Sequence, residues 1–344
     1  MVVPPVYIAG VGISHLKGRH SASNIEELAI SAATKALLDA GVSYSDVKHG
    51  IACFLGDDLK VSKRVFQSFG KTGAPITKVE GYSGMFIARQ FIKSGTSDCI
   101  LVVGFDQEEP HRKQWFGKGG RVAAVAAVLV NHTFLTSHAY LKDAAVVIRG
   151  AKVASPVHSQ SPLTAEETLS TKLAIEGALE QAVLAPDDIQ ILELRHGSNM
   201  SAQQALGALN VTEDGHASPI SNPFVGSTGL AGMCELVWQL RGWTRDRSVP
   251  NAKNCLQYTL GPDGTAYVTI IGRSDGKPAP KWEHVEHLRD GRERLGYNPA
   301  FESRGITSED WHAVRADEAF VPQETGKRLS LSAKGGDRAA LARL

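Results

Sequence analysis

Apolar runs that are typical of buried strands alternate with amphipathic stretches along most of the chain. The run Val6–Ile13 has the continuous apolar character of a buried strand, and the stretch after it places apolar residues at helical spacing. We expect this helix to begin at the capping box Ser23-x-x-Glu26 and to end near Gly41. The same criteria predict strands at Ile76–Val79, Cys99–Phe105, Val122–Val130, Ala145–Ile148, Ile189–Leu194, Cys255–Leu260 and Ala266–Ile271, and helices at Ser83–Lys93, Ala165–Val183 and Thr228–Arg241. This alternation predicts an α/β fold.

Three segments of the first half of the chain recur in the second half in the same order. The matched pairs begin at Ala36 and Ala178 (ALLDAGVSYSDV and ALEQAVLAPDDI), surround Met85 and Met233 (SGMFIARQFIKSG and AGMCELVWQLRG), and begin at Cys99 and Cys255 (CILVVGF and CLQYTLG). Ordered matches of this kind predict an internal duplication. We therefore expect an amino-terminal half (residues 1–140), a carboxy-terminal half (141–275) and a polar, partly helical tail (276–344).

The charge balance narrows the class of partner. The 344 residues include 37 Lys and Arg against 36 Asp and Glu, which gives a formal net charge of +1. A chain without excess positive charge has no strong electrostatic attraction for nucleic acid or for an anionic membrane. We therefore expect a small molecule or another protein as the partner.

The cysteines and the apolar runs bear on the compartment. The four cysteines lie far apart without a Cys-x-x-Cys pair, so we expect neither a disulfide framework nor a metal site, and a reducing compartment. The longest apolar run, Val122–Val130, is far shorter than the ~20 residues of a spanning helix, and the amino terminus does not read as a signal peptide. The last residues, Ala342-Arg343-Leu344, resemble the Ser-Lys-Leu address of peroxisomal proteins. We expect a peroxisomal or cytoplasmic protein without a membrane span.

Several long phrases carry a resemblance to a known family. They are ELVWQLRGW (Glu235–Trp243), VPNAKNCLQYTLGPDGTAYVTI (Val249–Ile270), FIARQFIKSGTSDCILVVGF (Phe86–Phe105) and, in the tail, LGYNPAFESRGIT (Leu295–Thr307). Between Val6 and Arg273 the chain resembles the thiolase superfamily, and most closely the thiolase domain of sterol-carrier-protein-x-type enzymes. The resemblance implies two duplicated α/β halves stacked in five layers (αβαβα) and a homodimer. It also implies chemistry in which acyl groups pass between a cysteine and coenzyme A.

The nucleophilic cysteine of that family is expected in a turn before the helix at Phe86. This chain reads KVEGYSGMF there, without a cysteine. The turn is shorter than in relatives, and depending on where the gap is placed the nucleophile position belongs to Ser83, Gly81 or Lys78. Losing the nucleophile from a cooperating catalytic set typically costs on the order of a millionfold in turnover.

The other catalytic phrases of the family are also altered. The His-Asp-Cys-Phe phrase reads Arg195-His196-Gly197-Ser198 here, so glycine stands at the proton-shuttling cysteine. The Gly-His-Pro loop is replaced by residues Asn222–Ser227, which contain no histidine. The acyl-binding insertion of relatives is reduced to Glu108–Gly120. The resemblance therefore predicts the fold but not ordinary thiolysis or Claisen condensation.

Polar residues at the expected cavity form a different candidate site. The predicted catalytic residues are His196, Arg195, Tyr82 and Ser83, and the predicted substrate-binding residues are Glu80, Ser198, Asn199, Ser227, Thr228, Tyr258 and Asp263. A histidine beside Arg195 can stay neutral near pH 7 and act as a general base, and the helix starts at Ser83 and Thr228 can hold an oxyanion. The alternative interpretation of the same residues is an inactive site that has filled with ordinary loop residues. A second pattern, Gly10-x-Gly12 after a strand, lacks the third glycine of a dinucleotide-binding site.

Three functional hypotheses follow from these residues. The first is an enzyme that acts without a covalent cysteine on an acyl, polyketide-like or coenzyme-A-linked substrate, by acid–base chemistry such as cyclisation, aldol-type closure or hydrolysis. It needs no cofactor, and coenzyme A enters only as part of a substrate. The second is a catalytically silent protein that binds an acyl ligand or pairs with an active thiolase. The third is a thiolase that uses a displaced cysteine, Cys53 or Cys234.

Overall fold

The computed structural model describes residues 4–15, 25–55, 59–80, 83–106, 123–156, 163–195, 205, 207, 209, 218–220, 229–244, 247–261, 263–285 and 305–316. The chain forms two compact units. The first unit contains residues 8–144, 224–231 and 291–344, and the second contains residues 1–7, 145–223 and 232–290. Within the described residues, no helix combines the length and the apolar character needed to cross a membrane.

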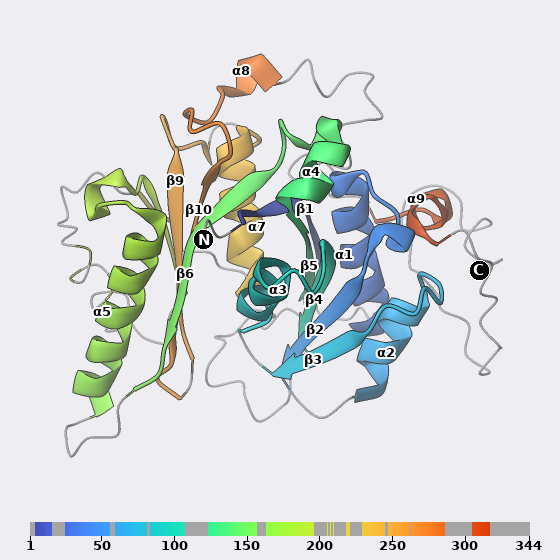
Figure 1. Ribbon diagram of the computed structural model, residues 1–344, viewed down its shortest axis with the longest axis horizontal. Helices are drawn as coiled ribbons and strands as arrows, with labels where there is room; N and C mark the ends of the chain where they lie inside the picture. Colours follow the sequence, from blue (N-terminus) through green and yellow to red (C-terminus); the bar gives the residue numbers. More distant parts are fainter. Residues whose placement is uncertain are drawn as a thin grey trace. The chain divides into compact units, whose positions relative to one another are not determined.

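The first unit is built around one mixed sheet. Its strands are β1 (Val6–His15), β2 (His49–Leu55), β3 (Ile76–Glu80), β4 (Cys99–Asp106) and β5 (Ala123–Asn131), in the order β3-β2-β4-β5-β1. Strand β2 is parallel to β3 and β4, and β5 is antiparallel to β4. Helices α1 (Ile25–Ala40) and α3 (Gly84–Lys93) cover opposite faces of the sheet (Figure 1). The unit also contains α2 (Leu59–Gln67), α4 (His132–Ser137), α9 (Ser308–Val314) and the short turns η1 (Tyr44–Asp46) and η4 (Ala139–Leu141).

The second unit repeats this plan. Its strands are β6 (Val146–Ala154), β7 (Ile191–Arg195), β8 (Ser218–Ile220), β9 (Asn254–Leu260) and β10 (Ala266–Arg273), in the order β8-β7-β9-β10-β6. Strand β7 is parallel to β8 and β9, and β10 is antiparallel to β9 and β6. Helices α5 (Leu163–Ala182) and α7 (Leu230–Arg241) lie on opposite faces (Figure 1), and η5 (Pro186–Asp188) and α8 (Trp282–Val285) complete the unit. Position by position, the strand order matches that of the first unit, as the internal repeat predicts.

Glycines in equivalent strands let a helix approach its sheet closely in both units. A β-carbon on Gly10 of β1 would overlap the carbonyl oxygen of Ala36 on α1. A β-carbon on Gly12 would overlap the carbonyl oxygen of Ala32, one turn earlier in the same helix. A β-carbon on Gly150 of β6 would likewise overlap the carbonyl oxygen of Ala178 on α5. Ala36 and Ala178 are the two residues at which the sequence repeat begins. The Gly10-x-Gly12 pattern is therefore explained by helix–strand packing.

Both helices also end in the same way. After α1, the amide of Gly41 donates to Leu38 O (2.9 Å) and the next amide, of Val42, donates to Leu37 O (3.1 Å). After α5, the corresponding bonds join Val183 N to Glu180 O (3.2 Å) and Leu184 N to Leu179 O (3.1 Å). Gly41 has φ 60° and Val183 has φ 54°, so both occupy the left-handed position that closes a helix. Gly41 ends its helix as predicted, whereas Ser23 of the predicted capping box lies outside the described residues.

The sequence prediction omitted several elements of the first unit, of which β2 and α2 are the longest. Strand β2 (HGIACFL) is the strand between β3 and β4, and α2 follows it. The strand was missed because His49 and Gly50 interrupt its apolar character. Helix α2 was missed because its apolar face is narrow, with Val61, Val65 and Phe66 buried between exposed basic residues. All of the strands and helices that the sequence predicts are present, and their ends differ from the predicted ones by a few residues.

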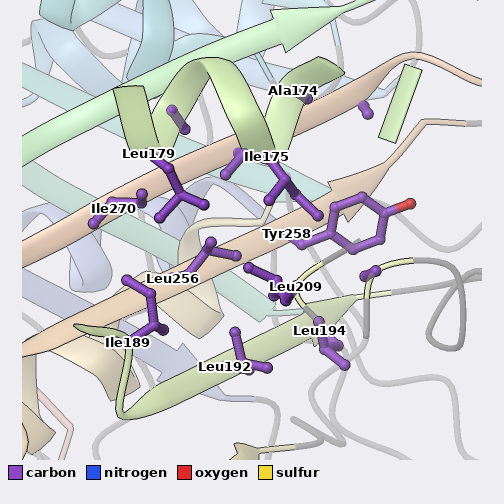
Figure 2. Close-up of a cluster of buried hydrophobic side chains, with 14 residues drawn as sticks. Ala174, Ile175, Leu179, Ile189, Leu192, Leu194, Leu209, Leu256, Tyr258 and Ile270 are labelled. Carbon is purple, nitrogen blue, oxygen red and sulfur yellow. The ribbon is translucent and has the colours of Figure 1, made fainter. Parts of the chain in front are cut away.

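The core of the second unit lies between α5 and one face of its sheet. Figure 2 shows Ala174, Ile175 and Leu179 of α5 facing side chains from β7, β9 and β10. The strand residues of this cluster include Leu192, Leu194, Leu256, Tyr258 and Ile270. Because side chains alternate along a strand, the residues between them lie on the opposite face, toward α7.

Candidate functional site

Ser83 is the described candidate at the amino terminus of α3. It is the N-cap of that helix, is half-buried, and accepts from Ile87 N through its carbonyl oxygen (2.9 Å). Its hydroxyl does not hydrogen-bond to the first turn of the helix, although serine at this position often does. Glu80 is the last residue of β3, and its side chain is outside the described set, as is Tyr82. The backbone of the first unit therefore brings Glu80 and Ser83 to the same strand-to-helix connection.

Cys53 of β2 lies directly beneath the start of α3. A β-carbon on Gly84, the first residue of the helix, would overlap the Cys53 sulfur and would touch Val102 Cγ1 at 3.5 Å. The Cys53 side chain is only 1% exposed. Glycine at position 84 therefore creates the space that the thiol fills. The thiol is enclosed between the sheet and the helix.

Strand β7 places Arg195 at the carboxyl end of a parallel pair in the second unit. Arg195 is the last residue of the strand and lies opposite Thr259 of β9. The Arg195 side chain and the predicted site residues His196, Ser198, Asn199, Ser227 and Thr228 are outside the described residues. Their assignment to the site stays a prediction. The carboxyl ends of parallel strands are where α/β folds commonly place ligand-binding loops.

Tyr258 and Asp263 have structural partners on the α5 side of the sheet. The Tyr258 ring belongs to the core cluster, and its hydroxyl is 2.9 Å from Thr171 Oγ1 on α5. Burial raises the pKa of Tyr258, and the bond with Thr171 partly opposes this shift. Exposed Asp263 accepts from Thr265 N (3.1 Å) and from Thr265 Oγ1 (2.8 Å), and so fixes the β9–β10 turn. These contacts explain both residues by packing and turn formation.

A buried carboxylate on the α7 side of the same sheet was missed by the sequence prediction. Glu193 of β7 is 2% exposed, and Gln257 of β9 donates to its Oε2 at 3.0 Å. A β-carbon on Gly232 of α7 would overlap the Glu193 carboxyl group. The available signal was a charged residue inside the otherwise apolar strand run ILEL. Burying an ionisable group is costly unless it is hydrogen-bonded, so such a residue deserves a functional explanation.

Further polar residues neighbour this carboxylate in the sheet. Thr269 of β10 lies opposite Gln257, and Thr259 lies one pleat further along β9, opposite Arg195. Thr259 is buried, with 3% exposure. The α7 side of the sheet is thus polar next to the end of β7, whereas the α5 side is apolar.

Comparisons with known proteins agree on the fold. No protein-family model matches the chain. It is 24% identical to sterol carrier protein 2 of Oryctolagus cuniculus, with 78% of this chain and 72% of that protein covered. It is 23% identical to non-specific lipid-transfer protein-like 2 of Caenorhabditis elegans, with 78% and 96% covered. Because these alignments extend over 397 and 398 residues, more than the 344 of this chain, the relatives contain segments that it lacks.

Solved structures of thiolases and ketosynthases match as well. Human mitochondrial 3-ketoacyl-CoA thiolase superposes with a TM-score of 0.61 at 13% identity, covering 80% of this chain and 100% of the thiolase. An oxazolomycin ketosynthase domain from Streptomyces albus superposes with a TM-score of 0.62 at 15% identity, covering 81% and 98%. The chain therefore has a thiolase-like α/β fold, and its sequence resembles those of the sterol carrier proteins.

The phrase ELVWQLRGW, which carries part of the resemblance, forms a structural network in this thiolase-like protein. Glu235 accepts from Arg247 Nη1 (2.6 Å) and from Gln239 Nε2 (3.2 Å). The Gln239 side chain also accepts from Val249 N (3.0 Å), which ties α7 to the segment leading into β9. The Arg241 guanidinium stacks 4.7 Å from the centre of the Trp243 ring. The phrase therefore identifies the fold through contacts that hold α7 in place.

Every cysteine of the thiolase-like protein is buried. Cys53 and Cys234 are each 1% exposed, and Cys99 and Cys255 are fully buried in strands. Burial raises the pKa of the Cys99 and Cys255 thiols well above the ordinary range. Since the thiolate is the nucleophile, a buried thiol is a poor acceptor for an acyl group. These positions do not favour the third hypothesis, a displaced cysteine.

Proposed function

We propose that this thiolase-like protein converts an acyl, polyketide-like or coenzyme-A-linked substrate by acid–base chemistry without an acyl-cysteine intermediate. The observation that supports the proposal is the burial of all four cysteines. In addition, β7 ends at Arg195, opposite buried Thr259 of β9, and the proposed base His196 is the next residue in the sequence. The reaction class is cyclisation, aldol-type closure or hydrolysis.

In the proposed closure, His196 removes a proton from the carbon next to a substrate carbonyl. The resulting enolate attacks a second carbonyl of the same substrate, and the new alkoxide takes a proton from Tyr82 or Ser83. The positive charge of Arg195 favours neutral His196 and so favours its role as base. The proposed donors to a developing oxyanion are the backbone N–H groups at the helix starts predicted near Ser83 and Thr228. Substrate contacts are proposed for Glu80, Ser198, Asn199, Ser227 and Thr228; the packing roles of Tyr258 and Asp263 leave them outside the mechanism.

Single substitutions test the base assignment. With a substrate found by screening acyl thioesters, we expect His196→Ala to lower kcat by about 10²–10⁴-fold, the usual contribution of a general base. Arg195→Ala should shift the acidic limb of the pH–rate profile upward, because neutral histidine loses its cationic neighbour. His132→Ala, at an exposed site on α4, is the matched control and should leave kcat unchanged. Unchanged conversion in both site variants would refute the assignment.

A second function, favoured by the name of one relative, is binding of an acyl lipid without turnover. The relative from Caenorhabditis elegans is named non-specific lipid-transfer protein-like 2. In this alternative the protein binds an acyl ligand or pairs with an active thiolase. Saturable binding of a fluorescent fatty acyl probe, together with no conversion of any acyl thioester, would favour it. Turnover by the purified protein alone would exclude it.

We also propose a homodimer that forms through the edge of the first unit. Strand β3 is the last strand of its sheet order, is five residues long and contains no proline. Strand β8, at the end of the other sheet order, has three residues and contains Pro219. Proline and short length protect an edge strand from pairing, so β3 is the more available edge. Sedimentation should show a dimer that Lys78→Pro converts to a monomer, since the register of β3 against β2 leaves the Lys78 N–H on the outer edge of the strand, and a wild-type monomer would contradict this.

The proposed location is the peroxisome. Residues 342–344, which carry the candidate address, lie outside the described residues. A fluorescent protein fused to the amino terminus should enter peroxisomes, and deletion of residues 342–344 should leave it in the cytosol. Cytosolic fluorescence for both forms would oppose a peroxisomal location.

A further inference from the structure

We propose that Glu193 is a positioning residue, which fixes the carboxyl end of β7 relative to β9 and to the first turn of α7. The inference deepens the proposed function, because it concerns the placement of Arg195 and His196. Glu193 lies two residues before Arg195 on β7. Its carboxylate accepts from Gln257 of β9 and occupies the space that a β-carbon on Gly232 of α7 would need. One side chain thus joins two strands and a helix close to the end of β7.

The fold alone does not require this polar pair. Equivalent hydrogen bonds align the two units. In the second unit, Gln190 N donates to Asn254 O (3.1 Å), and Glu193 and Gln257 lie three residues after these two residues, on β7 and β9. In the first unit, Lys48 N donates to Cys99 O (2.9 Å) in the equivalent place. Ile51 and Val102 lie three residues after Lys48 and Cys99, and they are paired between β2 and β4. The same sheet position is therefore filled by an apolar pair in one unit and by a carboxylate and an amide in the other.

Burying the polar pair costs free energy, and this cost favours a role in restricting the local geometry. Ile51 and Val102 are both 0% exposed, so their position can be packed by apolar side chains alone. A buried carboxylate contributes little net stability compared with a well-packed apolar residue, but its hydrogen bonds restrict the geometry around it. The position of Gly232 adds a second restriction, because any side chain there would displace the carboxyl group. The pair is suited to holding the end of β7 and the start of α7 in one arrangement.

Amide hydrogen exchange of the full chain tests this role without a substrate. We expect Glu193→Gln to speed exchange in peptides covering residues 195–199 and 229–233 by at least about tenfold, through local opening. Glu235→Gln is the matched control, since Glu235 is also a buried carboxylate that accepts from a glutamine amide. It should change exchange in the peptide covering residues 195–199 by less than about twofold, because the Glu235 network joins α7 to the segment before β9 and not to β7. The exchanged pair Glu193→Gln with Gln257→Glu restores one carboxylate and one amide, and should return exchange toward the wild-type rate.

The outcomes separate this inference from the proposed function. Equal effects of Glu193→Gln and Glu235→Gln, or no rescue by the exchanged pair, would overturn the positioning role. Where a substrate is known, Glu193→Gln should lower kcat by about 10–100-fold with little change in KM, because misplacement of a catalytic group affects the chemical step. If the exchange pattern holds but the wild-type protein converts nothing, the proposed function fails and the positioning role stands.

Discussion

The two units of the protein share a frame but differ where the helix after the third strand meets the sheet. Gly84 begins α3 and Gly232 lies in the first turn of α7, and each is the residue before the repeated methionine. Beneath Gly84 the sheet presents the thiol of Cys53, whereas beneath Gly232 it presents the carboxylate of Glu193. The two strand residues are not equivalent, because the register that matches Ile51 to Glu193 matches Cys53 to Arg195, so the matched glycines meet different strand positions as well as different side chains.

The largest losses of stability are expected at the close helix–strand contacts that the two units share. Gly10→Ala and Gly150→Ala should each lower the free energy of unfolding by about 3 kcal/mol, since the new methyl group overlaps a helix carbonyl that cannot move freely. Denaturant unfolding monitored by circular dichroism measures both. Gly305→Ala is the control, because the new methyl group has no atom of the described residues within 4 Å apart from those of its neighbours in the chain. A large loss in only one unit would show that the shared close approach is not equally important in both.

Intermediate losses of stability are expected at Gly84 and Gly232, where the two units place different side chains against the helix. Gly84→Ala should cost about 1–3 kcal/mol of stability, and Cys53→Ala should largely rescue it by removing the sulfur that overlaps the new methyl group. Gly232→Ala should be rescued in stability by Glu193→Ala. That double variant should still show the fast exchange after β7 that loss of Glu193 causes. Thermal unfolding of the four single and two double variants gives the coupling energies. Absence of coupling in either pair would contradict the contact.

The smallest expected effect concerns the matched helix ends. Val183 has a left-handed backbone, which is strained for a β-branched residue, and its side chain is 88% exposed. We expect Val183→Gly to stabilise the protein by about 1 kcal/mol, and Gly41→Val to destabilise it by about 1–2 kcal/mol. The midpoint of urea unfolding measures both changes. If Val183→Gly lowers the midpoint, the strain is absent or is offset by contacts of the valine side chain.

The sequence was sufficient for the duplication and for most of the fold, because strand runs and helix ends have local signals. The repeat beginning at Ala36 and Ala178 anticipated two equivalent helices, and Gly41 marked a helix end. Strand β2 was not predicted because a short strand that begins with histidine and glycine has weak periodicity. A strand is specified by its neighbours in the sheet as much as by its own residues.

The candidate site was harder to predict because its chemistry depends on which face of a strand a residue occupies. Tyr258 was placed at the cavity from its position near the end of a strand, but it faces α5 and packs in the core. Glu193 was not selected, because its contacts with Gln257 and Gly232 join residues that are distant in the sequence. His196 and its neighbours remain predictions that the described residues do not place.

Intact-protein mass spectrometry during turnover tests the central claim that no cysteine carries the acyl group. The protein is mixed with a converted acyl thioester, quenched in acid within one turnover, and weighed. We predict the unmodified mass at every time point, together with loss of conversion in His196→Ala and full conversion in Cys53→Ser. An acyl adduct that forms and decays at the rate of turnover, and that is absent from Cys53→Ser, would contradict the account.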